Sequence, residues 1–309
     1  MLSLSIRRLG RGAAPVPMDR AASVKEDDFQ ELCMDQARQK SGKDHNLGMR
    51  GRDVPRVRFG IIQMGRAEDL EDGLRTMRDL ASTLGKVDIA SLPEMWITGT
   101  LGEEEERRLT EEGAEVASAL GGVLVVGGYV APRKGRPVVV SRAVSAAGLV
   151  SEASKRFPSR AVGERLEVAP GDGPSSFDFP GGKAGVVICV DASYPELVRL
   201  PALEGAHLVI NPASIPFDRI YLWRAMAQSR AAENTVFFAV VNLAEAVYKD
   251  GRRVEGNSVV ASPEGKVLVE LGRKETTEVV HLDLDEIRAR RERWPYLEDI
   301  RGFYEGRRP

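Results

Sequence analysis

Residues 186–196 read VVICVDASYPE, an apolar run that ends at a cysteine and passes into an acidic turn closed by Tyr-Pro-Glu. Such a run followed by a turn and a proline predicts a buried strand that leads into a helix. Cys189 is one of only two cysteines in the chain, and the other is Cys33. Its position at the end of the strand fits a packed structural thiol or an activated nucleophile, and the rest of the sequence has to decide between them.

The strand around Cys189 belongs to a long alternation of apolar runs and segments with helical spacing that begins at Arg56. Strands are predicted at 57–64, 87–94, 122–130, 183–190, 207–214, 236–244 and 276–284, hairpins at 137–150 and 257–271, and helices at 68–84, 103–120, 193–206, 222–234 and 285–295. Runs such as LVVGG and VVI are too uniformly apolar for a half-exposed sheet. The order of elements therefore predicts an α/β fold with mixed sheets covered by helices.

The first 55 residues differ in texture from the rest of the chain. They mix Arg, Lys, Asp, Gly and Pro, with one amphipathic segment at 24–40. We expect residues 1–55 to be an N-terminal extension that is partly helical or disordered. Cys33 lies on the expected helix and is interpreted as structural. Residues 56–309 are expected to form a single domain.

Composition restricts the class of partner and the cellular location. The chain has 309 residues, a formal net charge of −2, 42% hydrophobic and 29% charged residues, which is typical of a soluble globular protein. This charge gives no reason to expect nucleic acid or an anionic membrane as a partner. No apolar run approaches the roughly 20 residues that span a bilayer. Because two cysteines make no disulfide framework, we expect a cytoplasmic protein.

Three polar residues stand at the ends of predicted strands or hairpins, where open sheets usually carry their sites: Glu94, Lys155 and Cys189. A thiol becomes a strong nucleophile once a base removes its proton, which a carboxylate can do while a nearby ammonium stabilises the thiolate. The ammonium can also hold the oxyanion of a tetrahedral intermediate, together with the backbone N–H of Val190. The three residue types therefore fit one reaction.

The histidines give no alternative to this set. They stand at positions 45, 207 and 281, and none has a neighbourhood that indicates a base or a metal-ligand spacing. We expect neither a metal nor an organic cofactor.

The same residues carry a resemblance to a known family. The stretches LPEMWITGT, SKRFP and GVVICVDASYPE, in that order, resemble the three catalytic signatures of the nitrilase superfamily, the carbon–nitrogen hydrolases. The likeness extends to GERLEVAPGDGPSSFDFPGGKAGVVIC, to NPASIPFDRIYLWRAMAQSRAAENTVFFAVVN and to GNSVVASPEGKVL, and it covers residues 57–304. It implies that 56–309 is a nitrilase-like catalytic domain with a four-layer α-β-β-α sandwich.

The resemblance also implies a role for each residue. Glu94 would be the general base that takes the thiol proton and then protonates the departing amine. Cys189 would form a thioester, and Lys155 would bind the oxyanion. Glu164 matches the second glutamate of the family, which orients the substrate and the lysine, although Glu167 lies close to it. The family further implies a homodimer or larger assembly through helices flanking the site and the C-terminal segment.

The substrate is the least determined feature. Members that act on carboxylate substrates often carry an arginine shortly after the nucleophile, and this chain has Ala-Ser-Tyr at 192–194. The ending Tyr-Pro-Glu is similar to aliphatic amidase and formamidase members, which favours a small neutral primary amide giving acid and ammonia. Tyr194 and Trp96 are candidates for the pocket, although Trp96 can equally pack in the core. Trp223 is expected in the core or at a subunit contact.

Alternatives of three kinds stay open. The same triad serves nitrile hydrolysis and N-carbamoyl amidohydrolysis. An acyl transferase would replace water by another acceptor at the thioester. A nitrilase-like domain without activity would serve binding or assembly, but it would not need Glu94, Lys155 and Cys189 together.

Overall fold

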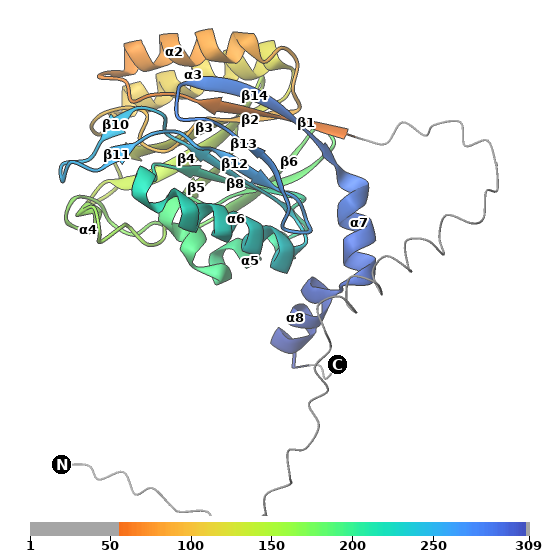
Figure 1. Cartoon of the computed structure of the whole chain (residues 1–309). Coiled ribbons are helices and arrows are strands. Elements are labelled where there is room, and N and C mark those ends of the chain that lie inside the picture. Colours follow the sequence, from red (N-terminus) through yellow and green to blue (C-terminus); the bar gives the residue numbers. More distant parts are fainter. Residues whose placement is uncertain (1–55, 307–309) are drawn as a thin grey trace, which may run out of the picture. The chain divides into compact units, whose positions relative to one another are not determined.

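The computed structural model describes residues 56–306, and these form two six-stranded sheets with helices on their outer faces (Figure 1). The first sheet has the order β14-β1-β2-β3-β4-β5. Its strands are β1 (Arg56–Gln63), β2 (Ile89–Ser91), β3 (Val123–Ala131), β4 (Val138–Ser145), β5 (Gly148–Ser154) and β14 (Thr276–Asp283). The strands β1, β2 and β3 are parallel, and the other neighbours pair antiparallel.

The second sheet has the order β13-β12-β9-β8-β7-β6, again with three parallel strands in the middle, β7, β8 and β9. Its strands are β6 (Ser175–Phe179), β7 (Gly182–Val186), β8 (Leu208–Ala213), β9 (Phe237–Asn242), β12 (Val259–Ala261) and β13 (Val267–Glu270). A small hairpin of β10 (Ala246–Val247) and β11 (Arg253–Val254) stands outside both sheets.

Helices cover the outer face of each sheet (Figure 1). Helices α2 (Leu70–Thr83) and α3 (Glu103–Leu120) pack on the first sheet, and α5 (Pro195–Leu203) and α6 (Ile220–Asn234) pack on the second. The remaining helices are α4 (Glu164–Glu167), α7 (Leu284–Arg293), α8 (Tyr296–Tyr304) and two 3-10 turns, Cys189–Ser193 and Phe217–Arg219. The result is a four-layer α-β-β-α sandwich, as predicted.

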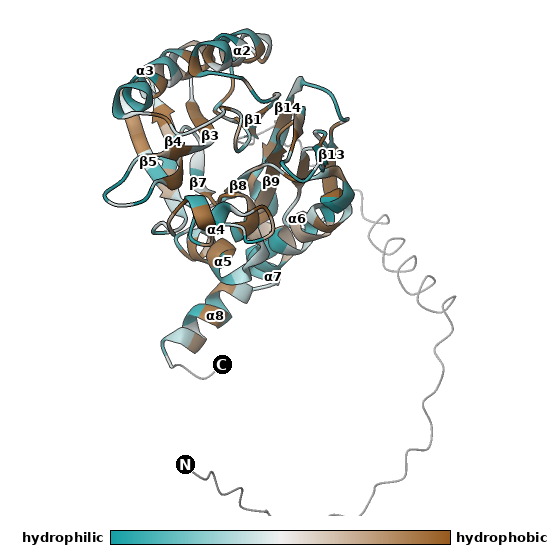
Figure 2. Cartoon of the chain, turned by 90° about the vertical axis from the view of Figure 1, so that its left-hand side faces the viewer, coloured by the Kyte–Doolittle hydropathy of each residue, from teal (hydrophilic) through white to brown (hydrophobic). Residues whose placement is uncertain are grey.

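The strand β3 shows why its sequence is apolar without interruption. Its side chains alternate between two environments because successive residues of a strand point to opposite faces. Val123 and Val125 belong to the core between the sheets, whereas Leu124 and Val126 pack beneath α2 and α3. Figure 2 shows these apolar strands between helices whose outer faces are hydrophilic. Both faces of the strand are therefore buried, and a polar side chain would meet solvent at neither face.

The predicted strands and hairpins are present, with shorter bounds in places. The short elements α4, β6, β10 and β11 were not anticipated. The expected C-terminal helix at 285–295 is α7, which ends at Arg293, and the helix α8 that begins after Pro295 was not anticipated. A proline lacks a backbone hydrogen-bond donor and clashes with a preceding helical turn, so α7 does not continue through residue 295.

The expectations for residues 1–55, including Cys33, lie outside the described residues, and the boundary at residue 56 stays a prediction. None of the helices in the described part is long and apolar enough to cross a membrane. A cytoplasmic location stays a prediction as well.

Candidate active site

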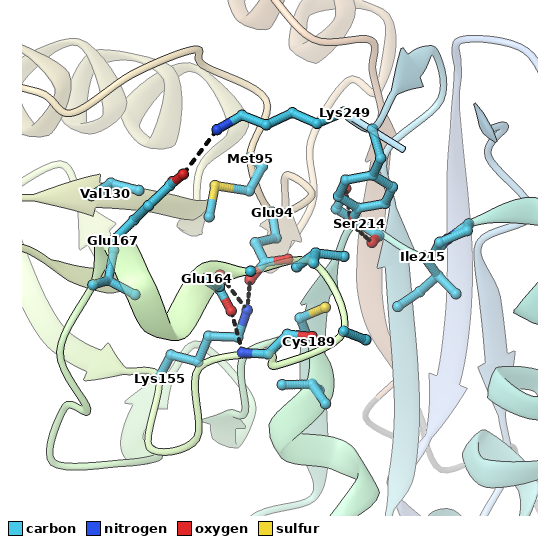
Figure 3. Close-up of a pocket in the computed structure, with 18 of the residues that line it drawn as sticks. Glu94, Met95, Val130, Lys155, Glu164, Glu167, Cys189, Ser214, Ile215 and Lys249 are labelled. Atoms are coloured by element: carbon cyan, nitrogen blue, oxygen red, sulfur yellow. Dashed lines mark hydrogen bonds and ion pairs between the residues drawn. The ribbon is translucent and has the colours of Figure 1, made fainter. Parts of the chain in front are cut away.

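A cavity of about 710 Å³ lies at the carboxyl ends of the central strands, where residues from both sheets meet (Figure 3). Its volume is in the range of small-molecule sites, about 300–1,000 Å³. Glu94, Lys155, Glu164 and Cys189 all line it, although they lie on four separate segments of the chain. The structure thus brings together the residues that the sequence singled out.

Cys189 sits at a sharp backbone turn after β7. Its φ is +46°, in the left-handed region that costs a residue with a side chain on the order of 1–3 kcal/mol. The amide Nδ2 of Asn211, on β8, donates to the carbonyl oxygens of Val187 at 2.6 Å and of Cys189 at 3.0 Å. These two hydrogen bonds hold the strained turn in place, so the thiol is presented to the cavity.

Asp191 connects the turn of Cys189 to the segment that follows Lys155. Its carboxylate accepts hydrogen bonds from the backbone N–H groups of Arg156 at 2.6 Å and Phe157 at 2.9 Å. Asp191 therefore braces the turn.

Glu94 follows β2, and a close approach of the backbone of β3 fixes its position. A Cβ added to Gly128 would lie 2.7 Å from Cγ of Glu94, and one added to Gly127, whose φ is +72°, would lie 2.0 Å from the carbonyl oxygen of Pro93. Only glycines fit at these two positions. The N–H of Glu94 donates across the sandwich to the carbonyl oxygen of Ala213 at 3.2 Å.

The ammonium of Lys155 lies between two carboxylates (Figure 3). Its Nζ is 2.6 Å from Oε1 of Glu94 and 2.8 Å from Oε1 of Glu164. The other oxygen of Glu164 accepts from the N–H of Ser159 at 2.5 Å. Glu94 and Lys155 are each only 2% exposed. A buried charge is tolerated when it is paired and hydrogen-bonded, and this ammonium has both kinds of partner.

Burial and neighbouring charges set the protonation of the site. Burial raises the pKa of Glu94, against the opposing charge of Lys155, and Glu164 raises it further. Burial alone would lower the pKa of Lys155, but the negative charges of the neighbouring Glu94 and Glu164 outweigh it and raise that pKa well above its ordinary value. Burial and Glu94 also raise the pKa of the Cys189 thiol. The lysine is therefore charged and the thiol neutral at rest.

Tyr248, from the β10–β11 hairpin, is a member of the site that sequence reasoning missed. Its hydroxyl donates to the carbonyl oxygen of Ser214 and lies 3.1 Å from the Ser214 hydroxyl. Ser214 in turn makes a backbone hydrogen bond to Cys189 that lowers the thiol pKa, in opposition to burial. Tyr248 thus holds the segment that contacts the sulfur.

Two candidates for the pocket lie elsewhere: Trp96 takes the core position that the sequence also allowed, and the expectation for Tyr194 is corrected. Trp96 is fully buried in the first sheet's outer core, where its Nε1 donates to the carbonyl oxygen of Val126 at 2.8 Å. Tyr194 packs against Phe157, with ring centroids 4.4 Å apart, and does not line the cavity. Val190 lines the cavity, and its role as an oxyanion donor stays a prediction.

The wall includes other side chains that sequence reasoning did not place there. Trp223 packs in the hydrophobic core, as one of its two expectations had it, and also borders the cavity. Arg66, Arg219 and Lys249 line the cavity as well. Arg66 offered a signal, because it comes three residues after the strand β1 ends, the kind of position that marked Glu94. The described residues contain no cluster of three or more His, Cys, Asp and Glu side chains placed to hold a metal ion.

The sequence is similar to known proteins over most of its length. The sequence model of the carbon-nitrogen hydrolase family matches residues 58–292. An (R)-stereoselective amidase from Pseudomonas sp. is 32% identical in an alignment of 263 residues that covers 81% of this chain and 93% of that protein. A 2-oxoglutaramate amidase from Bacillus subtilis is 30% identical, over 69% of this chain and 85% of its own length.

Solved structures show the same fold. A carbon-nitrogen hydrolase from Helicobacter pylori superposes with a TM-score of 0.72 at 22% identity, over 80% of this chain and 96% of that one. Nit3 from Saccharomyces cerevisiae, described as a member of branch 10 of the nitrilase superfamily, superposes with a TM-score of 0.68 at 24% identity, over 78% and 94% of the two chains.

Proposed function

This chain belongs to the carbon-nitrogen hydrolase family, and from that premise we propose that it hydrolyses a primary amide to a carboxylic acid and ammonia. The observation that carries the proposal is the buried Lys155 ammonium held between Glu94 and Glu164, beside the thiol of Cys189. The names of the relatives, an (R)-stereoselective amidase and a 2-oxoglutaramate amidase, favour an amide as the bond that is cleaved.

In the first half of the proposed reaction, the thiol proton of Cys189 passes to the carboxylate of Glu94 as the sulfur attacks the amide carbon. Lys155 and the N–H of Val190 stabilise the oxyanion that forms. Glu94 then gives its proton to the amide nitrogen, the C–N bond breaks, and ammonia leaves a thioester on Cys189.

In the second half, water hydrolyses the thioester. Glu94 takes a proton from water as the oxygen attacks the thioester carbon, and the same oxyanion contacts apply. The C–S bond then breaks, the thiolate recovers its proton from Glu94, and the acid leaves. Glu164 touches no reacting atom in this scheme, and its part is to position the ammonium of Lys155.

The test is ammonia release from a panel of short amides, N-carbamoyl amines and nitriles, with Cys189→Ala beside the wild type. We expect release from amides that falls to background in the variant. Because an alanine replaces one small thiol, the variant should keep its melting temperature within a few degrees. If ammonia were released mainly from nitriles or from carbamoyl compounds, amide hydrolysis would be wrong and the activity would be nitrile or N-carbamoyl hydrolysis.

A folded wild-type protein that releases no ammonia from any of these compounds would overturn hydrolysis. Intact-mass measurement then distinguishes the two remaining functions, acyl transfer and binding without catalysis. A mass increase on the cysteine that an added amine discharges indicates acyl transfer, and an unchanged mass indicates a binding domain.

We also propose a homodimer or larger assembly through the C-terminal helices. The helix α8 carries Phe303 and Tyr304, which are 73% and 64% exposed, and large exposed aromatic groups of this kind mark contact surfaces. Size-exclusion chromatography with light scattering should give at least a dimer at micromolar concentration, and Phe303→Glu should shift it toward monomer. A wild-type monomer would contradict the proposal.

A further inference from the structure

We propose that Arg66 makes this cavity selective for amides whose acyl part carries a carboxylate. The inference rests on the proposed function, because a primary amide loses only ammonia and any anionic group must then lie on the acyl side. It differs from the neutral substrate that the sequence favoured, and it rests on charges that the fold brings into the cavity from distant segments.

The first observation is the balance of charges along the wall. Every carboxylate that lines the cavity already has a cation of the wall as its partner within 4 Å: Glu94 and Glu164 with Lys155, Glu167 with Lys249, and Asp250 with Arg252. Two guanidinium groups of the wall, those of Arg66 and Arg219, have no carboxylate partner among the described residues. The cavity therefore has positive charge to offer to a ligand.

The second observation is how firmly Arg66 is held. Its backbone N–H donates to the carbonyl oxygen of Glu245 at 3.2 Å, and its Nε donates to the carbonyl oxygen of Met95 at 2.9 Å. The two terminal nitrogens of the guanidinium make no hydrogen bond or ion pair within residues 56–306. An arginine fixed at Nε with both terminal nitrogens free is prepared to bind a carboxylate.

The carbonyl that holds Arg66 lies next to the candidate base. Met95 follows Glu94 directly, has a φ of +58°, and donates its N–H to the carbonyl oxygen of Gly128 at 2.6 Å. This unusual backbone conformation is maintained beside the group that takes the proton. Arg66 is thus anchored to the same turn that positions Glu94, so a carboxylate bound by Arg66 would orient the amide relative to the base and the nucleophile.

Arg219 adds charge from the second sheet. It is exposed at the start of α6, and its guanidinium lies 5.9 Å from the ring centroid of Trp223. An exposed arginine without a carboxylate partner raises the local concentration of anions more than it orients them. We therefore assign orientation to Arg66 and attraction to Arg219.

The size of the cavity agrees with a substrate of this kind. A volume of about 710 Å³ is suited to an extended molecule, with several carbons between the amide and a second polar group. The sequence lacks an arginine at 192–194, just after the nucleophile. Arg66 supplies a cation from a loop more than 120 positions earlier in the chain, which no local motif around Cys189 could reveal.

The test compares three amides of equal chain length: glutaramate, pentanamide and 5-aminopentanamide. In the wild type we expect kcat/KM to fall in that order, with glutaramate at least about tenfold above pentanamide, a gap within the range of one charged hydrogen-bonded contact. In Arg66→Met the ratio of glutaramate to pentanamide should fall about tenfold, mainly through KM. Arg66→Lys should lie between, because it keeps the charge without the two-pronged geometry.

The matched control is Arg288→Met. Arg288 is an exposed arginine on α7, paired with Asp285 and outside the cavity wall, and its removal should leave the ratio unchanged. A second measurement needs no variant: added potassium chloride should raise the KM of glutaramate and leave that of pentanamide alone, because salt screens only the charged substrate.

Equal kcat/KM for glutaramate and pentanamide in the wild type would overturn the inference. So would an Arg66→Met variant that slows all three amides by the same factor, since that outcome assigns Arg66 to support of the Met95 turn alone. Absence of ammonia from every amide is a different result. It would overturn the proposed amide hydrolysis, and this inference with it.

Discussion

The two sheets repeat one strand pattern and hold their parts of the site by different means. In each sheet three parallel strands are flanked by one antiparallel strand on one side and two on the other. The first sheet and the segments after it supply Glu94 and Lys155, and the second supplies Cys189. Glu94 is placed by steric fit, because the backbone at Gly127 and Gly128 comes so close that no side chain has room.

The second sheet holds its reacting residue mainly by hydrogen bonds. Cys189 is placed by hydrogen bonds from Asn211 and by the brace of Asp191, which together maintain a backbone conformation that the residue does not favour. The comparison teaches that steric contact alone can position a carboxylate on a short turn. A nucleophile on a strained turn also needs hydrogen-bond donors for the backbone carbonyl groups of that turn.

The largest expected effect concerns the carboxylate of the first sheet. Glu94→Gln removes the proposed base, so kcat should fall by about 10³-fold or more, within the range of general acid–base catalysis. The control is Glu106→Gln, which changes a carboxylate in the same half that is also buried and paired, with Arg142 at 2.9 Å, but lies outside the cavity wall. Ammonia release and thermal melts should show a lower melting temperature in both variants and lost activity only in Glu94→Gln.

The next test breaks the support of the second sheet. Asn211→Ala leaves two carbonyl groups of the Cys189 turn without donors, which should cost about 2–3 kcal/mol of stability. Displacement of the sulfur by about 1 Å should lower kcat by about 10²-fold. The readouts are kcat and the rate of iodoacetamide alkylation at Cys189, followed by peptide mass.

The control for that test is Asn234→Ala. Asn234 is equally buried, and its amide donates to the carbonyl oxygen of Arg230 within α6. If Asn211→Ala lost stability but kept the kcat of Asn234→Ala, the hydrogen bonds from Asn211 would be ordinary packing contacts.

The steric device of the first sheet gives a smaller effect. Gly128→Ala places a Cβ 2.7 Å from Cγ of Glu94, which pushes the carboxylate away and should lower kcat about tenfold, with a loss of about 1–3 kcal/mol of stability. Gly272→Ala is the control, because a Cβ there meets nothing within 4 Å. Equal kcat in the two variants would remove steric fit as the device that places Glu94.

The smallest expected effect is a shift of the pH profile. Glu94 acts as base only when ionised, and burial raises its pKa, so kcat/KM should decline as pH falls through a range above that of an ordinary carboxyl group. The negative charge of Glu164 adds to this increase. Glu164→Gln should therefore move the acidic limb to lower pH.

The control for the profile is Glu167→Gln, at the glutamate that the sequence could not separate from Glu164. Glu167 pairs with Lys249 and not with Lys155, so its replacement should leave the limb in place. A limb that moves equally in both variants would mean that neither glutamate is special to the site.

The sequence predicted the strands and the residues at their ends because both depend on local pattern. Cys189 and Glu94 each follow an apolar run, and the rule that open sheets carry their sites at strand ends found them. The same rule did not reach Tyr248, because it lies on a short hairpin whose position depends on tertiary contacts. Trp96 failed as a pocket residue for a related reason: nothing in its neighbourhood reveals which way a turn residue points.

The hydrogen bond from Glu94 to the carbonyl oxygen of Ala213 has a consequence for unfolding. It joins the end of β2 in one sheet to the end of β8 in the other, so the reacting groups exist as a set only while the two sheets are docked. In a urea titration, activity should be lost at or below the urea concentration at which the two sheets separate, even if secondary structure survives there. A protein with all its reacting groups on one sheet could keep some activity after its sheets separate. In this fold, a form with separated sheets is inactive.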